Sequence, residues 1–293
     1  AGICVETIPH IPQEIIKRLK LLAEKSKADF VILEVGGTVG EYQNAMFLEA
    51  SREMLLKQPQ DVLNVHVAYL PLPPSLGELK SKPVQTSVQL LHMAGINPDI
   101  IIGRAVTEID ETRKEKIATF CSVAKEDIYS NPDLPSIYQV PEFLENQGLT
   151  DRILGKFGMK RKKSDLSAWH IFNQKILGSR KKVKIGIVGK YFRSGDFSLE
   201  DSYVCVMEAV RQASWWNGVV PEITWIDSVD VENKGEQAIL SEYNGLIVPQ
   251  GWGSRGIEGK IQTAGFARKN KIPYLGLCFG MQLACIEFGR NVC

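Results

Sequence analysis

A cysteine between two glycines is the residue of this sequence whose type and surroundings most directly suggest catalysis. Residues 276–282 read Gly-Leu-Cys-Phe-Gly-Met-Gln, and Cys278 follows an apolar run that predicts a strand and precedes a predicted helix. This is the thiol form of the G-x-S-x-G turn, in which small residues flank the nucleophile because its strained backbone crowds them. A thiolate at a helix N-terminus is stabilised by the helix dipole and by free N–H groups. The pattern favours a nucleophile over a small buried hydrophobic residue, the commonest role of a free cysteine.

An oxyanion hole would need N–H donors near this cysteine, and the sequence offers two. The amide of Phe279 follows the cysteine directly. Residues 248–253 (Val-Pro-Gln-Gly-Trp-Gly) end the preceding apolar run, and ligand sites of open α/β sheets lie at the carboxyl ends of strands. A free N–H at Gly251 could therefore complete the hole.

The elements that must position these residues alternate between apolar runs and helical patterns. Short apolar runs that alternate with helices predict parallel sheets covered on both faces, so the expected fold class is α/β with two doubly wound, mostly parallel-sheet domains. We expect strands over residues 30–35, 62–70, 100–103, 183–188, 223–226, 246–248 and 274–277, and helices over 14–23, 45–57, 84–94, 203–213, 259–269 and 281–288.

A change of composition divides the chain into two domains. We expect one domain over residues 1–158, a linker over 159–182 and a second domain over 183–293. Within the linker, basic clusters at residues 160–163 and 180–182 flank a short segment over residues 166–177. They favour a solvated connector over a polyanion contact, because charge runs of this kind are usually solvated.

Composition excludes several classes of function. The 293 residues carry 35 basic and 34 acidic side chains, a formal charge of +1, whereas proteins that bind nucleic-acid phosphates usually have a large basic excess. No apolar run reaches the ~20 residues of a membrane span. The six cysteines include no C-x-x-C pair, which argues against a disulfide framework and a zinc ribbon and fits a reducing cytosol.

The residues around Cys278 resemble those of class I glutamine amidotransferases, and segments along essentially the whole chain resemble the CTP synthase family. The resemblance implies a P-loop-type amidoligase domain followed by a flavodoxin-like glutaminase domain. By this resemblance, ATP would phosphorylate O4 of UTP with the help of Mg²⁺. Ammonia released from glutamine by Cys278 would then displace the phosphate to give CTP, and GTP would act as an activator of the enzyme. A cytoplasmic homotetramer that also forms filaments is expected. The matching segments are residues 34–40, 77–83, 136–138, 189–191, 255–260 and 273–282.

The resemblance also assigns individual side chains. Glu34, at the end of a predicted strand, would hold Mg²⁺ close to a phosphate. Lys80 and Lys82, two apart in a segment expected to be extended, and Lys116 would contact the UTP phosphates, with surface charge as the alternative. The other assignments are Gln85 (UTP), Glu41 and Gln43 (CTP feedback, with Glu49 and Arg52 nearby), Asp133 and Leu134 (ATP adenine), Arg255 (GTP activation), His10 (coupling of the two activities, or a structural role) and Gly251, Phe279 and Gln282 (oxyanion hole and glutamine).

Several features depart from the family pattern. Gln250 replaces a glycine, which would cost about 1 kcal/mol if that position needs a positive φ and could weaken glutaminase activity. Gln43 replaces an acidic residue, which leaves the strength of CTP inhibition open, and residues 192–201 look longer than usual. No histidine follows His170, and no G-x-x-x-x-G-K-[ST] loop is present. We therefore expect an internal fragment that is inactive alone, with the phosphate loop and the glutaminase His and Glu outside it.

Two other functions remain open. One is a catalytically impaired paralogue that assembles with a true synthase and regulates it, favoured by Gln250 and Gln43. The other is a different amidotransferase-coupled ligase, such as relatives of cobyrinic acid or dethiobiotin synthase, which the segments 34–37 and 80–83 argue against.

Overall fold

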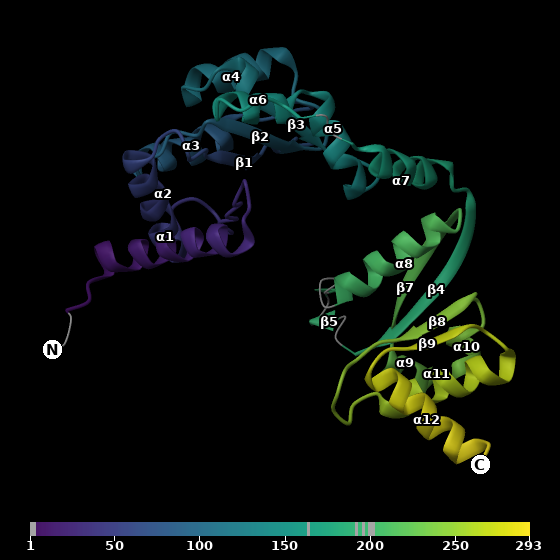
Figure 1. The fold of residues 1–293 in the computed structure, drawn as a ribbon. Helices are drawn as coiled ribbons and strands as arrows, with labels where there is room; N and C mark the ends of the chain where they lie inside the picture. Colours follow the sequence, from purple (N-terminus) through teal and green to yellow (C-terminus); the bar gives the residue numbers. More distant parts are fainter. Residues whose placement is uncertain (1–3, 163–164, 191–192, 195–196, 199–202) are drawn as a thin grey trace. The chain divides into compact units, whose positions relative to one another are not determined.

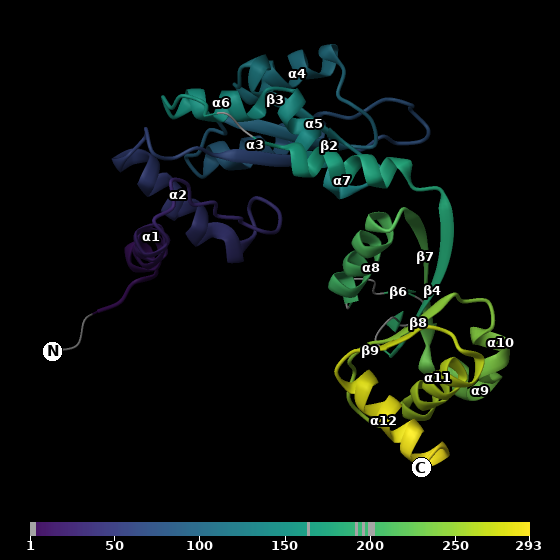
Figure 2. The same cartoon turned by 45° about the vertical axis from the view of Figure 1, so that its right-hand side comes forward.

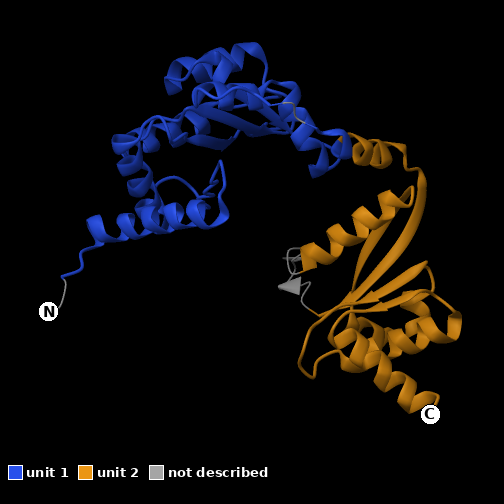
Figure 3. Ribbon diagram, in the orientation of Figure 1, with its two compact units in different colours: residues 1–169 blue, residues 170–293 orange. Residues whose placement is uncertain are grey.

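The computed structural model describes residues 4–162, 165–190, 193–194, 197–198 and 203–293. The chain divides into two compact units, Ala1–Trp169 (unit 1) and His170–Cys293 (unit 2), coloured separately in Figure 3. Helix α7 (Ser167–Gly178) lies within the segment that we expected to be a linker, and the division between the units falls inside it.

Unit 1 is built on a parallel sheet. Strands β1 (Val65–Tyr69), β2 (Ile100–Ala105) and β3 (Ile128–Pro132) lie in the order β1-β2-β3. The register pairs Val67 with Ile102 and Ile102 with Tyr129. Helices lie between successive strands along the chain, as Figure 1 shows, and this crossover connection is what a parallel pair requires.

One face of this sheet carries the core of unit 1. Ala68, Leu70 and Ile101 are buried there against Val84 of α3 (Lys82–Met93) and Ile117 of α4 (Glu111–Cys121). Successive strand residues point to opposite faces, and the alternate residues of β1 are largely exposed. Val65, Val67 and Tyr69 are 41%, 61% and 60% exposed. We expected both faces of the sheet to be covered. Within the described residues, the second face is not covered at β1.

The strand predicted over residues 30–35 was wrong. This segment is irregular, and Ile32 in it is 92% exposed. An apolar run forms a strand only where a neighbouring strand accepts its backbone hydrogen bonds, and no described strand pairs with it. Composition alone does not show whether such a partner is present.

Unit 2 has a second parallel sheet, in the order β7-β4-β8-β9. Ile187 and Ile247 pack on one face with Met207 of helix α8, whereas Val188 and Val248 pack on the other with helix α11. Figures 1 and 2 show α8 on one side of this sheet and α9 to α12 on the other. The bounds are β4 (Lys181–Gly189), β7 (Val219–Asp227), β8 (Gly245–Val248), β9 (Tyr274–Gly276), α8 (Val204–Trp216), α9 (Ser228–Lys234), α10 (Glu236–Leu240), α11 (Ile257–Asn270) and α12 (Phe279–Asn291).

The α/β class and the two parallel sheets predicted from the sequence are confirmed. No described helix combines the length and apolar character that crossing a bilayer would need. The remaining elements are α1 (Thr7–Ser26), η1 (Tyr42–Asn44), α2 (Ala45–Lys57), η2 (Lys125–Asp127), η3 (Ile137–Gln139), α5 (Val140–Asn146), α6 (Leu149–Lys156), β5 (Arg193–Ser194) and β6 (Phe197–Ser198).

Candidate active site

Cys278 occupies the turn between β9 and α12 in a conformation that few non-glycine residues adopt. Its φ is 52° and its ψ is −109°, and a positive φ brings Cβ into conflict with the backbone. A Cβ on Gly276 would lie 2.6 Å from the amide nitrogen of Met281, and one on Gly280 would lie 1.9 Å from the carbonyl oxygen of Val248. Both glycines are required for this turn. The predicted strand, strained turn and helix are confirmed in their geometry.

The second predicted element lies beside the first because their strands are neighbours. Val248, the last residue of β8, pairs with Gly276, the last residue of β9. The amide of Leu277 donates to the carbonyl oxygen of Val248 at 2.9 Å. The ring of Trp252 lies 4.5 Å from that of Phe279, centroid to centroid. The turn over residues 249–253 and the cysteine turn therefore follow adjacent strand ends of one sheet.

Among the residues that the structure describes, neither N–H group that the sequence assigns to the oxyanion hole has a backbone partner. Neither Gly251 nor Phe279 donates a backbone hydrogen bond to any described residue. The carbonyl of Cys278 accepts from the amides of Met281 and Gln282, at 3.1 and 3.3 Å. Cys278 itself is exposed. A free thiol at a helix N-terminus, with free amides nearby, suits attack on a carbonyl carbon.

The strain that we expected at Gln250 is absent. The positive-φ residues of this turn are Gly251, at 141°, and Gly253, at 100°, and Gln250 is not among the non-glycine residues with a positive φ. The expected penalty applies to a residue with a Cβ at a positive φ, so the substitution of glycine by Gln250 does not incur it.

Arg255 begins a segment that is packed tightly against α9. Its guanidinium donates to Asp227 at 3.0 Å, and the same carboxylate accepts from the amide of Val229 at 2.9 Å. A Cβ on Gly256 would lie 2.1 Å from the hydroxyl of Ser228. The segment therefore has a fixed position at the start of α11.

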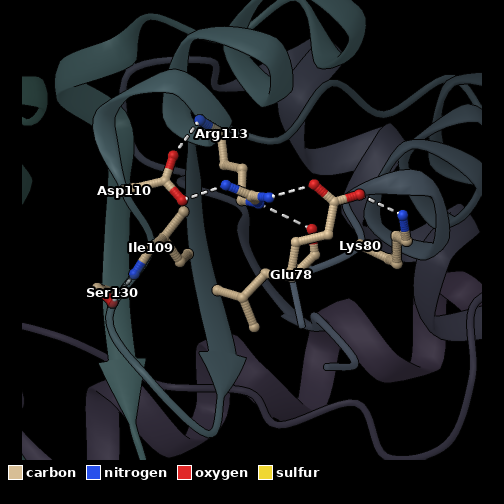
Figure 4. Close-up of polar contacts among 7 residues, drawn as sticks. Glu78, Lys80, Ile109, Asp110, Arg113 and Ser130 are labelled. Atoms are coloured by element: carbon tan, nitrogen blue, oxygen red, sulfur yellow. Dashed lines mark hydrogen bonds and ion pairs between the residues drawn. The ribbon is translucent and has the colours of Figure 1, made fainter. Parts of the chain in front are cut away.

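In unit 1, one of the predicted UTP lysines, Lys80, pairs with the carboxylate of Glu78. Figure 4 shows Arg113 between Asp110 and Glu78, with Lys80 on the far side of Glu78. Arg113 donates to Glu78 at 2.8 Å, and Lys80 forms an ion pair with it. The hydrogen bond from Lys80, and the charges of Lys80, Arg113 and Lys116, lower the pKa of Glu78. Lys80 is therefore in contact with Glu78, whereas Lys116 acts on this carboxylate only through its charge.

Lys82 does not lie in an extended segment with Lys80, as we had expected. It is the first residue of α3, because Pro83 at the next position favours the start of a helix. Gln85 is buried and donates to the hydroxyl of Ser81 at 3.1 Å. The segment after β1 therefore turns into a helix at Lys82 and does not continue as a strand.

The residues assigned to the ATP adenine follow β3. The guanidinium of Arg104, on β2, donates to Asp133 at 2.7 Å and to the carbonyl oxygen of Asn131 at 2.8 Å. Leu134 is half-buried beside Asp133. These residues lie at the carboxyl ends of neighbouring strands, where ligands of open α/β sheets bind.

The predicted feedback segment is held together by Glu41. Its carboxylate accepts from the amide of Thr38 at 2.9 Å and from the side-chain amide of Gln43 at 2.7 Å. These hydrogen bonds lower the pKa of Glu41. An acidic residue in place of Gln43 would repel this carboxylate, whereas the amide binds it.

Nearby helices hold three further residues that the sequence singled out. Glu49 and Arg52 form a two-bond ion pair on α2, at 2.9 and 2.6 Å. The Nδ1 atom of His10 accepts from the amide of Glu6 at 2.8 Å, in an apolar hollow of about 580 Å³ that Ile15 and Phe47 also line. His10 thus makes a local structural contact, and its role in coupling the two activities stays a prediction.

The described residues do not assemble a metal centre. No group of three or more His, Cys, Asp or Glu side chains that could hold an ion occurs among them. Glu34 supplies one carboxylate, which suits Mg²⁺ only where phosphates and water provide the other ligands. The longer segment noted at residues 192–201 lies mostly outside the described residues.

Sequence reasoning missed several residues of these sites. Lys260 and Lys190 contact the backbone of the 249–253 turn, although both stood in segments that resemble the family. Tyr203 donates to the carbonyl oxygen of Gln250 at 2.8 Å. Arg113 and Glu78 lie at the centre of the ion pairs that also include Lys80 and Asp110 in unit 1. In the sequence, only the position of Glu78 in the 77–83 segment could have indicated them.

Comparison with known proteins agrees with the two units. Residues 1–159 match the family model described as CTP synthase N-terminus, and residues 198–293 match that described as glutamine amidotransferase class-I. The CTP synthase of Sulfolobus acidocaldarius is 43% identical over 293 residues, covering 99% of this chain and 54% of its own length. That of Pelotomaculum thermopropionicum is 43% identical over 292 residues, covering 99% and 53%.

The chain thus spans about half the length of these curated relatives. The first family model alone covers more than half of the 293 residues, and the cysteine turn stands in the region that the amidotransferase model matches. The chain belongs to the CTP synthase family.

Proposed function

We propose that this chain takes part in the ATP-dependent conversion of UTP to CTP, with ammonia released from glutamine by Cys278. The observation that carries the proposal is the conformation of Cys278, held at a φ of 52° between two glycines that cannot carry a Cβ. Strain of this kind persists where the surrounding structure enforces it, often at functional sites. Residues 1–158 would form the amidoligase domain and residues 183–293 the glutaminase domain.

In the glutaminase half, the thiolate of Cys278 would attack the side-chain amide of glutamine. The sulfur–carbon bond forms as the carbonyl oxygen becomes an oxyanion. Collapse of the tetrahedral intermediate then breaks the carbon–nitrogen bond, the nitrogen takes up the proton lost by the thiol and leaves as ammonia, and water hydrolyses the thioester that remains on Cys278. The free amides of Gly251 and Phe279 are suited to hold that oxygen. Gln282, in the first turn of α12 and exposed, would contact the substrate. Arg255 would mediate activation by GTP.

In the amidoligase half, the cations around Glu78 would bind phosphate groups. Lys80, Lys82 and Lys116 would contact the UTP phosphates, with Gln85 as a polar contact. Asp133 and Leu134 would lie near the ATP adenine, and Glu34 would share Mg²⁺ with the bound phosphates. The site would use a few placed cations, which agrees with the near-neutral overall charge. Glu41 and Gln43 would bind CTP as a feedback inhibitor.

The test compares two nitrogen sources in the protein that carries this sequence. Cys278→Ala should abolish CTP formation from glutamine and leave CTP formation from added ammonia unchanged, because only the first route needs the thiol. Cys285→Ala is the matched control, since Cys285 is also exposed on α12. Unchanged use of glutamine by Cys278→Ala would refute the nucleophile assignment.

The amidoligase half is tested by UTP binding. Lys82→Ala should weaken UTP binding measured by calorimetry about tenfold, in line with the loss of one charge-assisted phosphate contact. Lys57→Ala, which removes an exposed lysine paired with Glu53, should leave binding unchanged. An unaltered affinity for Lys82→Ala would remove that residue from the site.

A regulatory paralogue is the second candidate. Gln250 no longer favours it, because the residue has no positive φ. Gln43 remains, and its contact with Glu41 is the observation that bears on CTP feedback. Absence of CTP formation from both glutamine and ammonia would favour this candidate over the enzyme.

A further inference from the structure

Lys260 is a lysine with no exposed surface directly beneath the 249–253 turn. Its side chain is 0% exposed and is one of the largest fully buried side chains of the described residues. Burial, together with the charge of Lys190, lowers the pKa of Lys260 to about 8. A buried ammonium is costly unless polar groups solvate it. The polar groups that solvate the ammonium of Lys260 are the carbonyl oxygens of Pro249, at 3.1 Å, and Gln250, at 3.5 Å.

Close packing of two helices puts Lys260 there. A Cβ on Gly259 would lie 1.9 Å from the carbonyl oxygen of Ser228, so any other residue would push α11 away from α9. The amide of Gly259 also donates to Glu232 at 2.9 Å. The first turn of α11 is therefore fixed, and with it the residue that follows Gly259.

Two more side chains hold the same turn. The hydroxyl of Tyr203 donates to the carbonyl oxygen of Gln250 at 2.8 Å. The ammonium of Lys190, itself 6% exposed, donates to the carbonyl oxygen of Trp252 at 3.2 Å and also contacts that of Gly253. Four carbonyl groups on either side of Gly251 are thus each directed at a donor.

The direction of a carbonyl fixes the direction of the next amide. In a trans peptide, the C=O of one residue and the N–H of the next lie in one plane and point in opposite directions. The donors on the carbonyl of Gln250 therefore turn the N–H of Gly251 away from Lys260 and Tyr203, and this N–H has no partner among the described residues.

We infer that Lys260 is a positioning residue of the glutaminase site, which acts through the peptide between Gln250 and Gly251 to aim the N–H of Gly251 at the oxyanion. Tyr203 acts on the same carbonyl, and Lys190 holds the other side of the turn. The inference rests on the proposed function, since it gives that N–H its role. A lysine that merely filled space would affect folding alone and would have no selective effect on oxyanion binding.

The experiment uses a probe that forms an oxyanion-like group without turnover. L-Glutamate γ-semialdehyde presents an aldehyde where glutamine has its amide. Addition of the Cys278 thiol forms a sulfur–carbon bond and opens the C=O double bond, and the thiol proton goes to the aldehyde oxygen. The product is a hemithioacetal whose oxygen takes the place of the oxyanion. Iodoacetamide is the companion reagent, because it alkylates the sulfur with loss of iodide and creates no such oxygen.

Lys260→Met should weaken binding of the semialdehyde by about tenfold or more, since loss of one oxyanion donor typically costs two to three orders of magnitude in rate. Its rate of alkylation by iodoacetamide at Cys278 should match that of the unmodified chain. Lys269→Met, on an exposed lysine of the same helix, is the control and should change neither. Equal semialdehyde binding by Lys260→Met and the unmodified chain would overturn the inference.

Two further measurements separate the inference from the proposed function. If Cys278→Ser binds the semialdehyde as well as the unmodified chain does, the proposed nucleophile is wrong. Hydrogen exchange then still tests Lys260, because exchange over residues 249–253 should become severalfold faster in Lys260→Met, and unchanged exchange would contradict its positioning role. If Lys260→Met does not fold, Tyr203→Phe removes a donor to the same carbonyl and should show the same selective loss.

Discussion

The carbonyl oxygen of Val248 occupies the space that a Cβ on Gly280 would need, with 1.9 Å between the two positions. The end of β8 and the start of α12 are therefore in backbone contact at this point. That contact sets the place of Cys278 relative to the 249–253 turn, because both follow directly from the two strands concerned.

Gly280→Ala should destabilise unit 2 by about 1–3 kcal/mol, the usual cost of overpacking. Gly289→Ala lies on the same helix with nothing within 4 Å of the added Cβ, so it should be neutral or stabilise by up to about 1 kcal/mol. Denaturant unfolding of both variants measures the difference. Equal unfolding free energies would mean that the close contact is not maintained in solution.

Because Lys260 is buried, we expect the stability of the chain to depend on pH. Its pKa is lowered from the usual 10.5 to about 8 in the folded chain, so between these values the unfolded chain binds a proton that the folded chain does not. Stability then rises with pH in this window. Relative to Lys260→Met, the unfolding free energy of the unmodified chain should increase by up to about 1.4 kcal/mol per pH unit there.

The measurement is denaturant unfolding of both proteins from pH 7 to pH 10.5, so that groups common to both cancel. Parallel curves would contradict the buried, perturbed lysine.

We expect the carboxylate of Asp127 to stabilise the fold of unit 1. Its carboxylate is 5% exposed and accepts from Arg152 at 2.6 Å and Lys156 at 3.0 Å. Burial alone would raise the pKa of Asp127, but these hydrogen bonds and charges outweigh it and lower the pKa. The stabilisation is therefore present at neutral pH and is lost only as the pH falls below the usual value of 3.8.

Asp127→Asn should cost about 1–3 kcal/mol in unfolding free energy at pH 7, because two cations lose their shared acceptor. The difference from the unmodified chain should shrink at acid pH. Asp151→Asn removes an exposed carboxylate paired with Arg161, and about 0–1 kcal/mol is expected there. A loss at Asp127 no larger than at Asp151 would refute the buried cluster.

Substitution of Glu78 should change nucleotide affinity in the opposite direction to substitution of a lysine such as Lys82. Its carboxylate engages Lys80 and Arg113 and would repel a triphosphate. Glu78→Gln should bind UTP severalfold more tightly at low salt, and the gain should fall as salt screens the charges. Calorimetric titration at two salt concentrations measures this. Weaker binding by Glu78→Gln would show that the carboxylate supports the site.

Much of this architecture is predictable because apolar runs set strands and helices locally. The predicted helix over residues 45–57 has the bounds of α2, and the run at 246–248 lies within β8. The segment 30–35 has the same apolar character but no described partner strand, and a sequence pattern does not report partners. The short polar helices α9 and α10 carry too little periodicity to be predicted.

The cysteine turn could be predicted in full, since the glycines at 276 and 280 record its steric demand in the sequence. The role of Lys260 could not, because its burial depends on contact of Gly256 and Gly259 with Ser228, about 30 residues away along the chain. The prediction of strain at Gln250 was wrong for a related reason. The fold of the turn sets the φ angles, and the positive values fall on Gly251 and Gly253.

The most direct test of Cys278 as the glutaminase nucleophile is selective labelling by an α-chloroketone analogue of glutamine. The thiol sulfur displaces chloride, and mass spectrometry identifies the labelled residue among the six cysteines, five of which are exposed. We expect the label on Cys278 first, at a rate that excess glutamine lowers. Even labelling of the exposed cysteines, with no protection by glutamine, would contradict the assignment.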